Sequence, residues 1–248
     1  MDGFRSLFTW IFGIAFVTLM FPITCSLWLI GIPFDKERRA VHSMVLFQGS
    51  FLSRSIPLWR LRVEGKEKIQ RDQAYVIISN HHSLLDVLLL NRLGNRFRWV
   101  SKTENFKVPI LGATMRMAKY IEVVRGNKES VIKMMDESLD ALSKGISVMM
   151  FPEGTRSRSE VPGPFKTGAF QLALKAGKPI LPVILHGTGT VLPKKGFRFS
   201  SGHRLLVRVL DPIFPESFGS EDPEVLAAGF RQLIASALEE VTFEQKKA

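Results

Sequence analysis

The sequence contains a single cysteine, Cys25, among its 248 residues. One cysteine cannot form an intramolecular disulfide, and a zinc site built from several thiolates is equally excluded. Because Cys25 lies inside an apolar run and no disulfide is possible, we expect the folded part of the chain to occupy a reducing compartment such as the cytoplasm.

Acidic residues are scarce relative to basic ones. The chain has 23 Asp and Glu against 34 Lys and Arg, which gives a formal net charge of +11. This excess implies an anionic partner, and composition alone leaves open nucleic acid, an anionic bilayer surface and phosphate-bearing substrates. A hydrophobic content of 46% excludes general disorder. The length allows one α/β domain or two small ones, and one compact domain with a membrane segment fits best.

Ionisable side chains other than Cys25 are missing from Leu7 to Phe34, a run of 28 residues. As one helix this run would be about 42 Å long, against a hydrocarbon core of about 30 Å. Pro22 lies near its middle, so a kinked spanning helix and two shorter helices dipping into one leaflet both fit. A signal peptide is the main alternative, but the run is too long and no small-x-small cleavage site follows before Asp35. We expect membrane embedding and leave spanning open.

Lys36, Arg38 and Arg39 follow the apolar run directly and place that end of it on the cytoplasmic side. Residues 40–56 are also apolar, with the spacing of an amphipathic helix that packs on the bilayer or on the domain core. We therefore assign residues 1–56 to an N-terminal membrane-anchoring helical segment and residues 57–248 to an α/β domain.

Apolar strand-like runs alternate with helical patterns through the rest of the chain. Predicted strands cover residues 58–63, 74–78, 97–100, 120–124, 146–151 and 180–185, and predicted helices cover residues 129–144, 169–176 and 224–241. The sequence has no internal repeat and no low-complexity linker. These features predict an α/β fold, a single-domain sandwich around a mixed β-sheet with an N-terminal apolar membrane-associated helical segment.

The residues from Asn80 to Asp86, Asn-His-His-Ser-Leu-Leu-Asp, join the strand at 74–78 to a second apolar run. His81 would stand at the carboxyl end of a buried strand, and Asp86 would lie in the first turn of the next helix. The carboxylate would keep one imidazole nitrogen protonated and leave the other free to take a proton from a hydroxyl. On this stretch alone, a helix-capping Asp86 beside an incidental His81 is the alternative. No Gly-x-Ser-x-Gly motif is present, so Ser83 has little support as a covalent nucleophile.

A second motif, Phe-Pro-Glu-Gly-Thr-Arg-Ser, spans residues 151–157 and directly follows a predicted strand. Gly154 can bring backbone N–H groups close to a ligand, and Arg156 can form paired hydrogen bonds to a phosphate or carboxylate. Glu153 would then orient Arg156 or bind substrate hydroxyls.

Together, Asn80-His81-x-x-x-x-Asp86 and residues 151–157 closely resemble the glycerolipid acyltransferases, especially the 1-acylglycerol-3-phosphate acyltransferases. Residues 180–183 resemble the fourth sequence block of that family, and residues 164–170 resemble the segment that precedes it. The resemblance runs from about Lys102 to Pro193, together with the first block. The second block departs from the family pattern because the Gly and the acid before Arg125 are missing, although Arg125 still aligns with the acceptor-phosphate ligand.

The resemblance implies a membrane-bound O-acyltransferase. It would transfer a fatty acyl group from acyl-CoA or acyl-ACP to the free hydroxyl of lysophosphatidic acid, giving phosphatidic acid in phospholipid biosynthesis. His81 would be the general base, oriented by Asp86. The residues implied to bind the acceptor or its phosphate are Arg125, Glu153, Gly154, Thr155, Arg156, Lys102 and Lys166. No metal is implied, and no cofactor beyond the thioester co-substrate.

The other histidines are interpreted without a chemical role. His82 is taken as a bystander because the family pattern counts to Asp86 from His81, and the absence of a paired acid at useful spacing makes His42, His186 and His203 structural. A late basic cluster consists of Lys194, Lys195, Arg198, His203, Arg204 and Arg208. It fits a solvated face, a surface for anionic lipid or an acidic carrier protein, or a nucleic-acid site. Nucleic acid is not expected, because it leaves the apolar run and both motifs unexplained.

Several alternatives stay open at this point. The acceptor could instead be glycerol 3-phosphate, another lysophospholipid or an acylated amino-acid lipid. A thioester hydrolase and a non-enzymatic basic protein that coats membranes come from other classes. The expected partners are lysophosphatidic acid, the acyl thioester and a lipid bilayer, with the α/β domain on the cytoplasmic face of a membrane such as the bacterial inner membrane.

Overall fold

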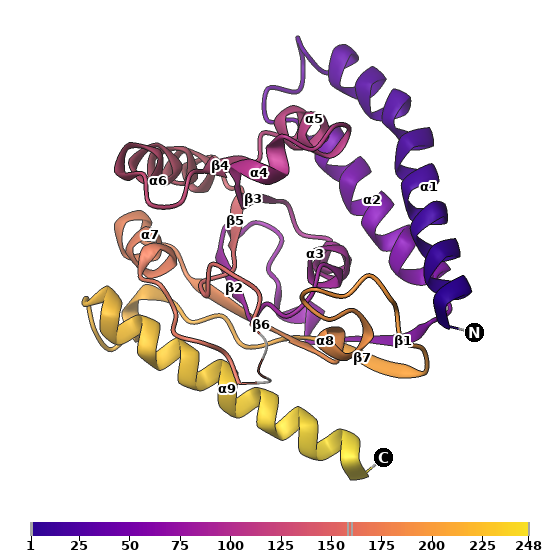
Figure 1. Cartoon of the computed structure of the whole chain (residues 1–248). Coiled ribbons are helices and arrows are strands. Elements are labelled where there is room, and N and C mark those ends of the chain that lie inside the picture. Colours follow the sequence, from indigo (N-terminus) through magenta and orange to yellow (C-terminus); the bar gives the residue numbers. More distant parts are fainter. Residues whose placement is uncertain (1, 158, 160, 248) are drawn as a thin grey trace.

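The computed structural model describes residues 2–157, 159 and 161–247, and it shows one mixed sheet between two layers of helices (Figure 1). In the described part of the chain the sheet has seven strands, in the order β1-β7-β6-β2-β5-β3-β4. Their bounds are β1 (Trp59–Glu64), β2 (Val76–Ser79), β3 (Phe97–Lys102), β4 (Ile121–Val123), β5 (Ser147–Met150), β6 (Ile180–His186) and β7 (His203–Val209). Strand β7 is antiparallel to β6 and parallel to β1, and the other neighbours are parallel. The predicted fold class is confirmed.

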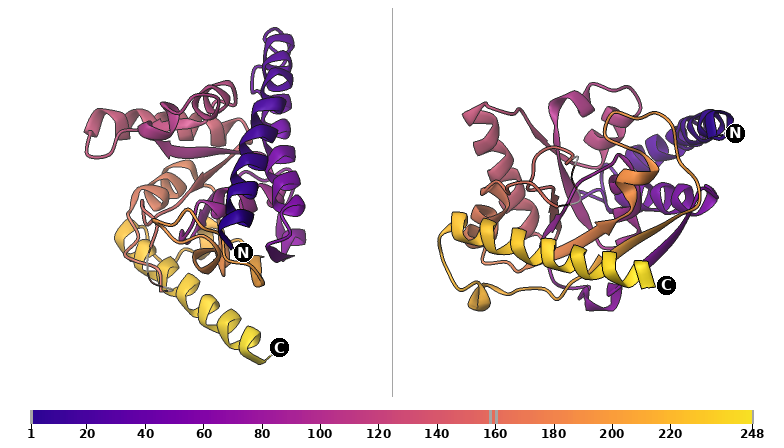
Figure 2. Two further views of the ribbon diagram at one scale, coloured as in Figure 1. Left: turned by 45° about the vertical axis from the view of Figure 1, so that its right-hand side comes forward. Right: turned by 60° about the horizontal axis from the view of Figure 1, so that its bottom comes forward.

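The helices cover both faces of this sheet (Figures 1 and 2). Their bounds are α1 (Asp2–Ile30), α2 (Arg39–Ser55), α3 (Leu85–Leu90), α4 (Thr103–Phe106), α5 (Leu111–Met117), α6 (Lys128–Ser143), α7 (Gly168–Ala176), α8 (Thr188–Val191) and α9 (Pro223–Lys247). Short 3-10 turns are η1 (Lys66–Lys68), η2 (Asn91–Leu93) and η3 (Pro215–Ser217). Helices α6, α7 and α9 pack on one face, and α2, α3, α5 and α8 pack on the other.

The central strands are apolar on both sides because each face of the sheet is covered. Along β2, Ile77 contributes to the core under α2 and α3, whereas Val76 and Ile78 contribute to the core under α6, α7 and α9. These three side chains are fully buried. A continuous apolar run therefore marks a central strand, and the parallel order brings the carboxyl ends of β2, β4, β5 and β6 to one edge.

One strand is missing from the sequence expectations. Strand β7 was not predicted, because His203, Arg204 and Arg208 in it look like a basic surface cluster, although four of its apolar residues are buried in the core. Of the two arrangements that the sequence leaves open for the apolar run, the structure shows the single helix, α1, which continues through Pro22. It ends at Ile30, directly before Gly31, Ile32 and Pro33.

Helix α1 lies along the side of the domain instead of projecting away from it (Figure 2). Near its beginning, Trp10 Nε1 donates a hydrogen bond of 2.8 Å to Phe197 O, and its ring packs on Phe199 with centroids 5.2 Å apart. Farther along, α1 contacts α2 and α5. In the described part of the chain, one helix, Gly3–Ile30, is long and apolar enough to cross a membrane. Its most apolar 18-residue window has a mean hydropathy of 2.0, and only 6% of that window is buried.

Helix α2 is anchored in the domain through His42, which is 5% exposed. Its Nδ1 lies 3.1 Å from the hydroxyl of Tyr120, and its Nε2 accepts a hydrogen bond of 3.3 Å from Phe97 N. Burial lowers the pKa of His42 from 6.5 to about 4, and the charges of Arg96 and Arg98 act in the same direction. The structural interpretation of His42 agrees with these contacts.

We expect His42 to make the fold sensitive to acid. Between pH 6.5 and about 4 the unfolded chain binds a proton at this position and the native chain does not, so stability is complete above pH 6.5 and falls as pH drops through this window. The full contribution is about 3 kcal/mol. Thermal unfolding of the detergent-purified protein followed by circular dichroism between pH 7.5 and 5 checks it. His42→Gln, which keeps hydrogen-bonding atoms, should show a shallower decline than the wild type, and identical declines would contradict the assignment.

Candidate active site

The loop after β2 is fixed to the neighbouring strand by Asn80, which is fully buried. Its Oδ1 accepts from Leu185 N at 2.9 Å, and its Nδ2 donates to Leu185 O at 2.8 Å. The side chain thus pairs with the backbone of β6 as another strand residue would, and it sets where the next residue, His81, leaves the sheet.

His81 and Asp86 meet across this loop, as their spacing indicates. His81 Nδ1 lies 2.7 Å from Asp86 Oδ2, and the same oxygen accepts from the backbone N–H groups of His82 at 2.6 Å and Ser83 at 2.8 Å. The Asp86 side chain is fully buried, and that of His81 is 15% exposed. Because a carboxylate can only accept, Nδ1 carries the proton and Nε2 of a neutral His81 keeps a free lone pair.

The plane of the His81 ring is set by aromatic stacking. The ring lies parallel to Phe151, with centroids 3.9 Å apart and an interplanar angle of 8°. The Phe151 ring in turn packs on Trp99, with ring centroids 5.5 Å apart. With Asp86 holding one ring edge and Phe151 covering one face, the orientation of the imidazole is defined on two sides. Such support is what a positioned proton acceptor requires.

The second motif is bound to the first by Glu153, which is 8% exposed. Its Oε1 accepts from His81 N at 2.9 Å, and its Oε2 accepts from Gly163 N at 2.9 Å. Ser157 N also donates to His81 O, at 2.7 Å. The sequence predicts that Glu153 orients Arg156 or binds substrate hydroxyls, whereas in the structure its two oxygens accept hydrogen bonds from main-chain N–H groups. The contact with His81 lies 72 positions apart in the sequence, and no local pattern signals it.

Gly154 occupies a turn that requires glycine, with a φ of 67°. A Cβ at this position would also stand only 3.1 Å from Lys166 Cε. The carbonyl of Gly154 accepts a hydrogen bond from Arg125 Nη2, so the incomplete second block still brings Arg125 to the second motif. The exposed side chain of Lys166 and the Arg125 guanidinium therefore both lie beside Gly154.

The remaining residues singled out from the sequence lie at or near the same edge. Arg156 is half-buried, and within the described part of the chain it forms no ion pair or side-chain hydrogen bond. Thr155 is exposed, and Lys102 ends β3 opposite Val123 of β4, two residues before Arg125. Among the described residues, no group of three His, Cys, Asp or Glu side chains is placed to hold a metal ion.

Ser83 is not available as a nucleophile in this arrangement. It is fully buried, its hydroxyl donates to Leu192 O at 2.7 Å, and it accepts from Leu85 N at 3.2 Å. The hydroxyl is therefore engaged in holding the loop before α3, in agreement with the missing Gly-x-Ser-x-Gly motif.

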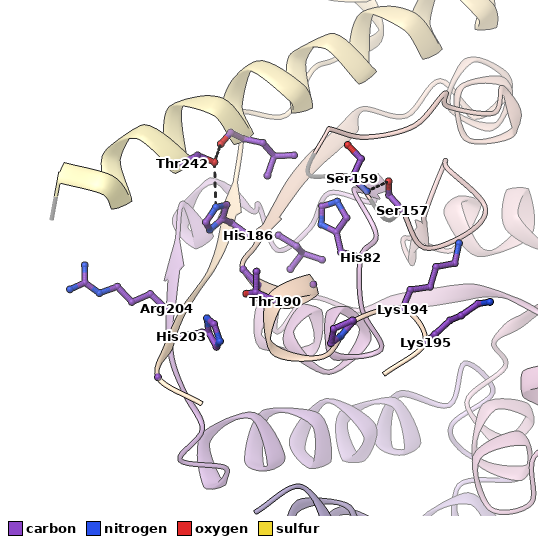
Figure 3. A pocket seen from close by; sticks show the side chains of 16 residues that line it. His82, Ser157, Ser159, His186, Thr190, Lys194, Lys195, His203, Arg204 and Thr242 are labelled. Carbon is purple, nitrogen blue, oxygen red and sulfur yellow. Dashed lines mark hydrogen bonds between the residues drawn. The ribbon is translucent and has the colours of Figure 1, made fainter. Parts of the chain in front are cut away.

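A pocket of about 840 Å³ opens beside His82, between β6, the loop before β7 and helix α9 (Figure 3). Ten of its sixteen described lining residues carry imidazole, hydroxyl or cationic side chains, namely His82, Ser157, Ser159, His186, Thr190, Lys194, Lys195, His203, Arg204 and Thr242. These come from five separate parts of the chain. The sequence predicts no chemical role for the histidines here, because only the tertiary fold brings them together.

Comparisons with known proteins show which chains this one is similar to. The 1-acyl-sn-glycerol-3-phosphate acyltransferase of Chlamydomonas reinhardtii is 32% identical over 93% of this chain and 68% of its own length. The chloroplastic enzyme of the same name from Arabidopsis thaliana is 37% identical over 67% of this chain and 48% of its own length. The chain thus spans about half the length of its chloroplastic plant relatives.

The crystal structure of the 1-acyl-sn-glycerophosphate acyltransferase of Thermotoga maritima superposes with a TM-score of 0.79. It covers 98% of both chains at 23% sequence identity, which establishes a shared fold. The family model described as Acyltransferase matches residues 60–186, which contain His81, Asp86 and the whole second motif. The chain therefore belongs to the acyltransferase family.

Proposed function

We propose that this protein is a membrane-bound 1-acylglycerol-3-phosphate O-acyltransferase that forms phosphatidic acid from lysophosphatidic acid and an acyl thioester. The observation that carries the proposal is the oriented His81–Asp86 pair, with Nδ1 2.7 Å from the carboxylate and Nε2 left as a base. The names of the relatives, 1-acyl-sn-glycerol-3-phosphate acyltransferases, support the acceptor.

In the proposed reaction, His81 Nε2 takes the proton of the acceptor hydroxyl as its oxygen attacks the thioester carbonyl carbon. The new C–O bond forms, the C–S bond breaks, and the proton passes from His81 to the leaving thiolate. Asp86 stabilises the imidazolium that exists between the two proton transfers. No covalent intermediate is needed, which fits the engaged hydroxyl of Ser83.

We propose that the acceptor phosphate binds beside Gly154. Arg125, Arg156 and Lys166 supply cationic groups on the β4 and β5 side of His81, and Lys102 and Thr155 belong to the same edge. Glu153 has a different proposed role, because its two main-chain hydrogen bonds set the distance between the His81 loop and this cationic group.

Membrane association is proposed from α1. Its large apolar side chains face outward, with Phe4 79%, Phe8 61%, Ile11 57% and Ile14 63% exposed. The helix contacts the domain near both ends, through Trp10 and through α5. A helix held lengthwise on the domain is suited to lie within one leaflet, because crossing the bilayer would draw α2 and the domain edge into hydrocarbon.

The acceptor assignment predicts that Arg156→Ala raises the KM for lysophosphatidic acid by about tenfold, since a charge-assisted contact to phosphate is lost. The KM for a monoacylglycerol, which lacks the phosphate, should change by less than about twofold. Steady-state kinetics with both acceptors measures this. Arg60→Ala, on the exposed side of edge strand β1, is the matched control. An equal rise in KM for the two acceptors would argue that Arg156 is structural.

The proposed function is tested by product analysis of the detergent-purified protein with a palmitoyl thioester. Lysophosphatidic acid, glycerol 3-phosphate and lysophosphatidylcholine are supplied separately, together with a reaction lacking any acceptor. Phosphatidic acid as the dominant product supports the proposal. A different acylated product would change the acceptor, and free fatty acid alone would assign a hydrolase.

A further inference from the structure

The pocket beside His82 is placed on the opposite side of His81 from the cationic group at Gly154. In the sheet, β2 lies between β6, whose end borders the pocket, and β5, whose end carries Gly154. Ser157 lines the pocket, and its backbone N–H donates to His81 O at 2.7 Å. A ligand in this pocket and an acceptor at Gly154 would therefore approach the imidazole from two sides.

The tautomer of His82 is set by Asn80. Because Asn80 Oδ1 accepts from Leu185 N, its Nδ2 is the atom that faces His82 Nδ1, at 3.3 Å. A neutral His82 accepts this hydrogen at Nδ1 and carries its own proton on Nε2. His82 Nε2 is buried and has no partner within the described part of the chain. In Figure 3 the His82 ring stands in the wall of the pocket. Its Nε2–H is therefore a hydrogen-bond donor that a ligand in the pocket could satisfy.

The rim of the pocket is cationic. Lys194, Lys195 and Arg204 line it, and the described lining residues include no Asp or Glu. None of the ion pairs among the described residues uses these three side chains, whereas Arg208 on the same strand as Arg204 is paired with Glu64 and Glu244. Unpaired cations at the mouth of a pocket suit a phosphorylated ligand.

We propose that this pocket binds the phosphopantetheine arm of the acyl donor, the chemical group that coenzyme A and acyl carrier protein share. The inference rests on the proposed function, which requires an acyl thioester beside His81. The volume of about 840 Å³ lies in the range of small-molecule sites. His82 Nε2–H donates to an amide carbonyl of the arm, and the Ser157 hydroxyl is available to its polar groups. Lys194 and Lys195, which lie on the same side of the pocket in Figure 3, hold the phosphate.

The test compares three donors that carry the same palmitoyl group: palmitoyl-CoA, palmitoyl acyl carrier protein and S-palmitoyl pantetheine, which has no phosphate. The Lys194→Ala/Lys195→Ala variant should raise the KM for a phosphorylated donor by about tenfold. The KM values for S-palmitoyl pantetheine and for lysophosphatidic acid should stay within about twofold. Arg198→Ala is the matched control, because it removes an exposed cation from the same loop outside the pocket lining.

The role of His82 is separated from that of the rim by its own pair of variants. His82→Leu should raise the KM for all three donors, since the arm is common to them, and His82→Gln, which keeps an N–H donor, should restore most of the loss. A fall in kcat with unchanged donor KM would overturn this role. Binding of desulfo-coenzyme A, measured by calorimetry, gives a readout that does not depend on turnover.

The outcomes distinguish this inference from the proposed function. If the wild type forms no phosphatidic acid from any donor, the proposed function fails. If the wild type is active but the Lys194→Ala/Lys195→Ala variant raises the KM for S-palmitoyl pantetheine as much as the KM for palmitoyl-CoA, the donor site is wrong while the function stands. The same holds if this variant raises the KM for lysophosphatidic acid instead. A loss confined to palmitoyl-CoA or to palmitoyl acyl carrier protein identifies the carrier that uses the pocket.

Discussion

His81→Ala is expected to lower kcat for acyl transfer by at least about 100-fold, the usual scale for a lost general base. The KM for lysophosphatidic acid should change little, because the proposed phosphate contacts come from residues on the β4 and β5 side of the ring. The reason is geometric: Nε2 is the one ring nitrogen left to accept a proton, since Nδ1 is held by Asp86 at 2.7 Å. Steady-state kinetics at saturating donor measures both parameters.

Two companion variants make this result specific. Asp86→Asn removes the charge that stabilises the imidazolium and should also lower kcat, with little effect on either KM. Ser83→Ala removes a buried hydroxyl from the same loop; it should lower the thermal midpoint but leave kcat within a few-fold of the wild type. Wild-type turnover in His81→Ala, or complete loss in Ser83→Ala, would exclude the proposed mechanism.

Phe8→Glu/Ile11→Glu in α1 is expected to lower partitioning onto lipid vesicles by at least about 100-fold. Each substitution removes a large exposed apolar side chain, worth about 1.5–3 kcal/mol on burial, and puts a charge in its place. Vesicle flotation with phosphatidylglycerol and phosphatidylethanolamine measures the bound fraction. The Glu substitutions should leave the domain folded, because both positions face away from it.

The matched control carries the same chemical change on another helix. Val225→Glu/Leu233→Glu replaces two apolar residues of α9 that are 55% and 37% exposed. This variant should float with vesicles as the wild type does. An equal fall in the vesicle-bound fraction of both variants, or an unchanged bound fraction of the α1 variant, would show that α1 is not the membrane-binding surface.

The sequence predicts those parts of the site that are local in the chain. His81 and Asp86 are five positions apart, and a buried strand followed by a short loop and a helix is enough to bring them together. The glycine turn at Gly154 is equally local. Six of the strands are visible in the sequence, five from apolar residues that are buried in the sheet and β1 from alternating apolar and basic residues, as at a half-exposed edge.

Features that depend on distant contacts are not predicted. Glu153 reaches the backbone of His81 across 72 positions, and His82 borders a pocket whose other walls come from β6, the loop before β7 and α9. Strand β7 is missed for a related reason: its flanking charges suggest a surface, and only pairing with β1 and β6 shows that its middle is buried. Local sequence patterns do not indicate contacts between residues that are so far apart in the chain.

The central claim is that the protein transfers an acyl group directly from a thioester to lysophosphatidic acid. The most direct test measures thiol release and acylated product together, with detergent-purified wild-type protein and palmitoyl-CoA or palmitoyl acyl carrier protein, in the presence and absence of lysophosphatidic acid. We predict that thiol is released only when the acceptor is present, and that phosphatidic acid forms in an equal amount. Thiol release without acceptor, accompanied by free palmitate or palmitoylated protein, would contradict the account.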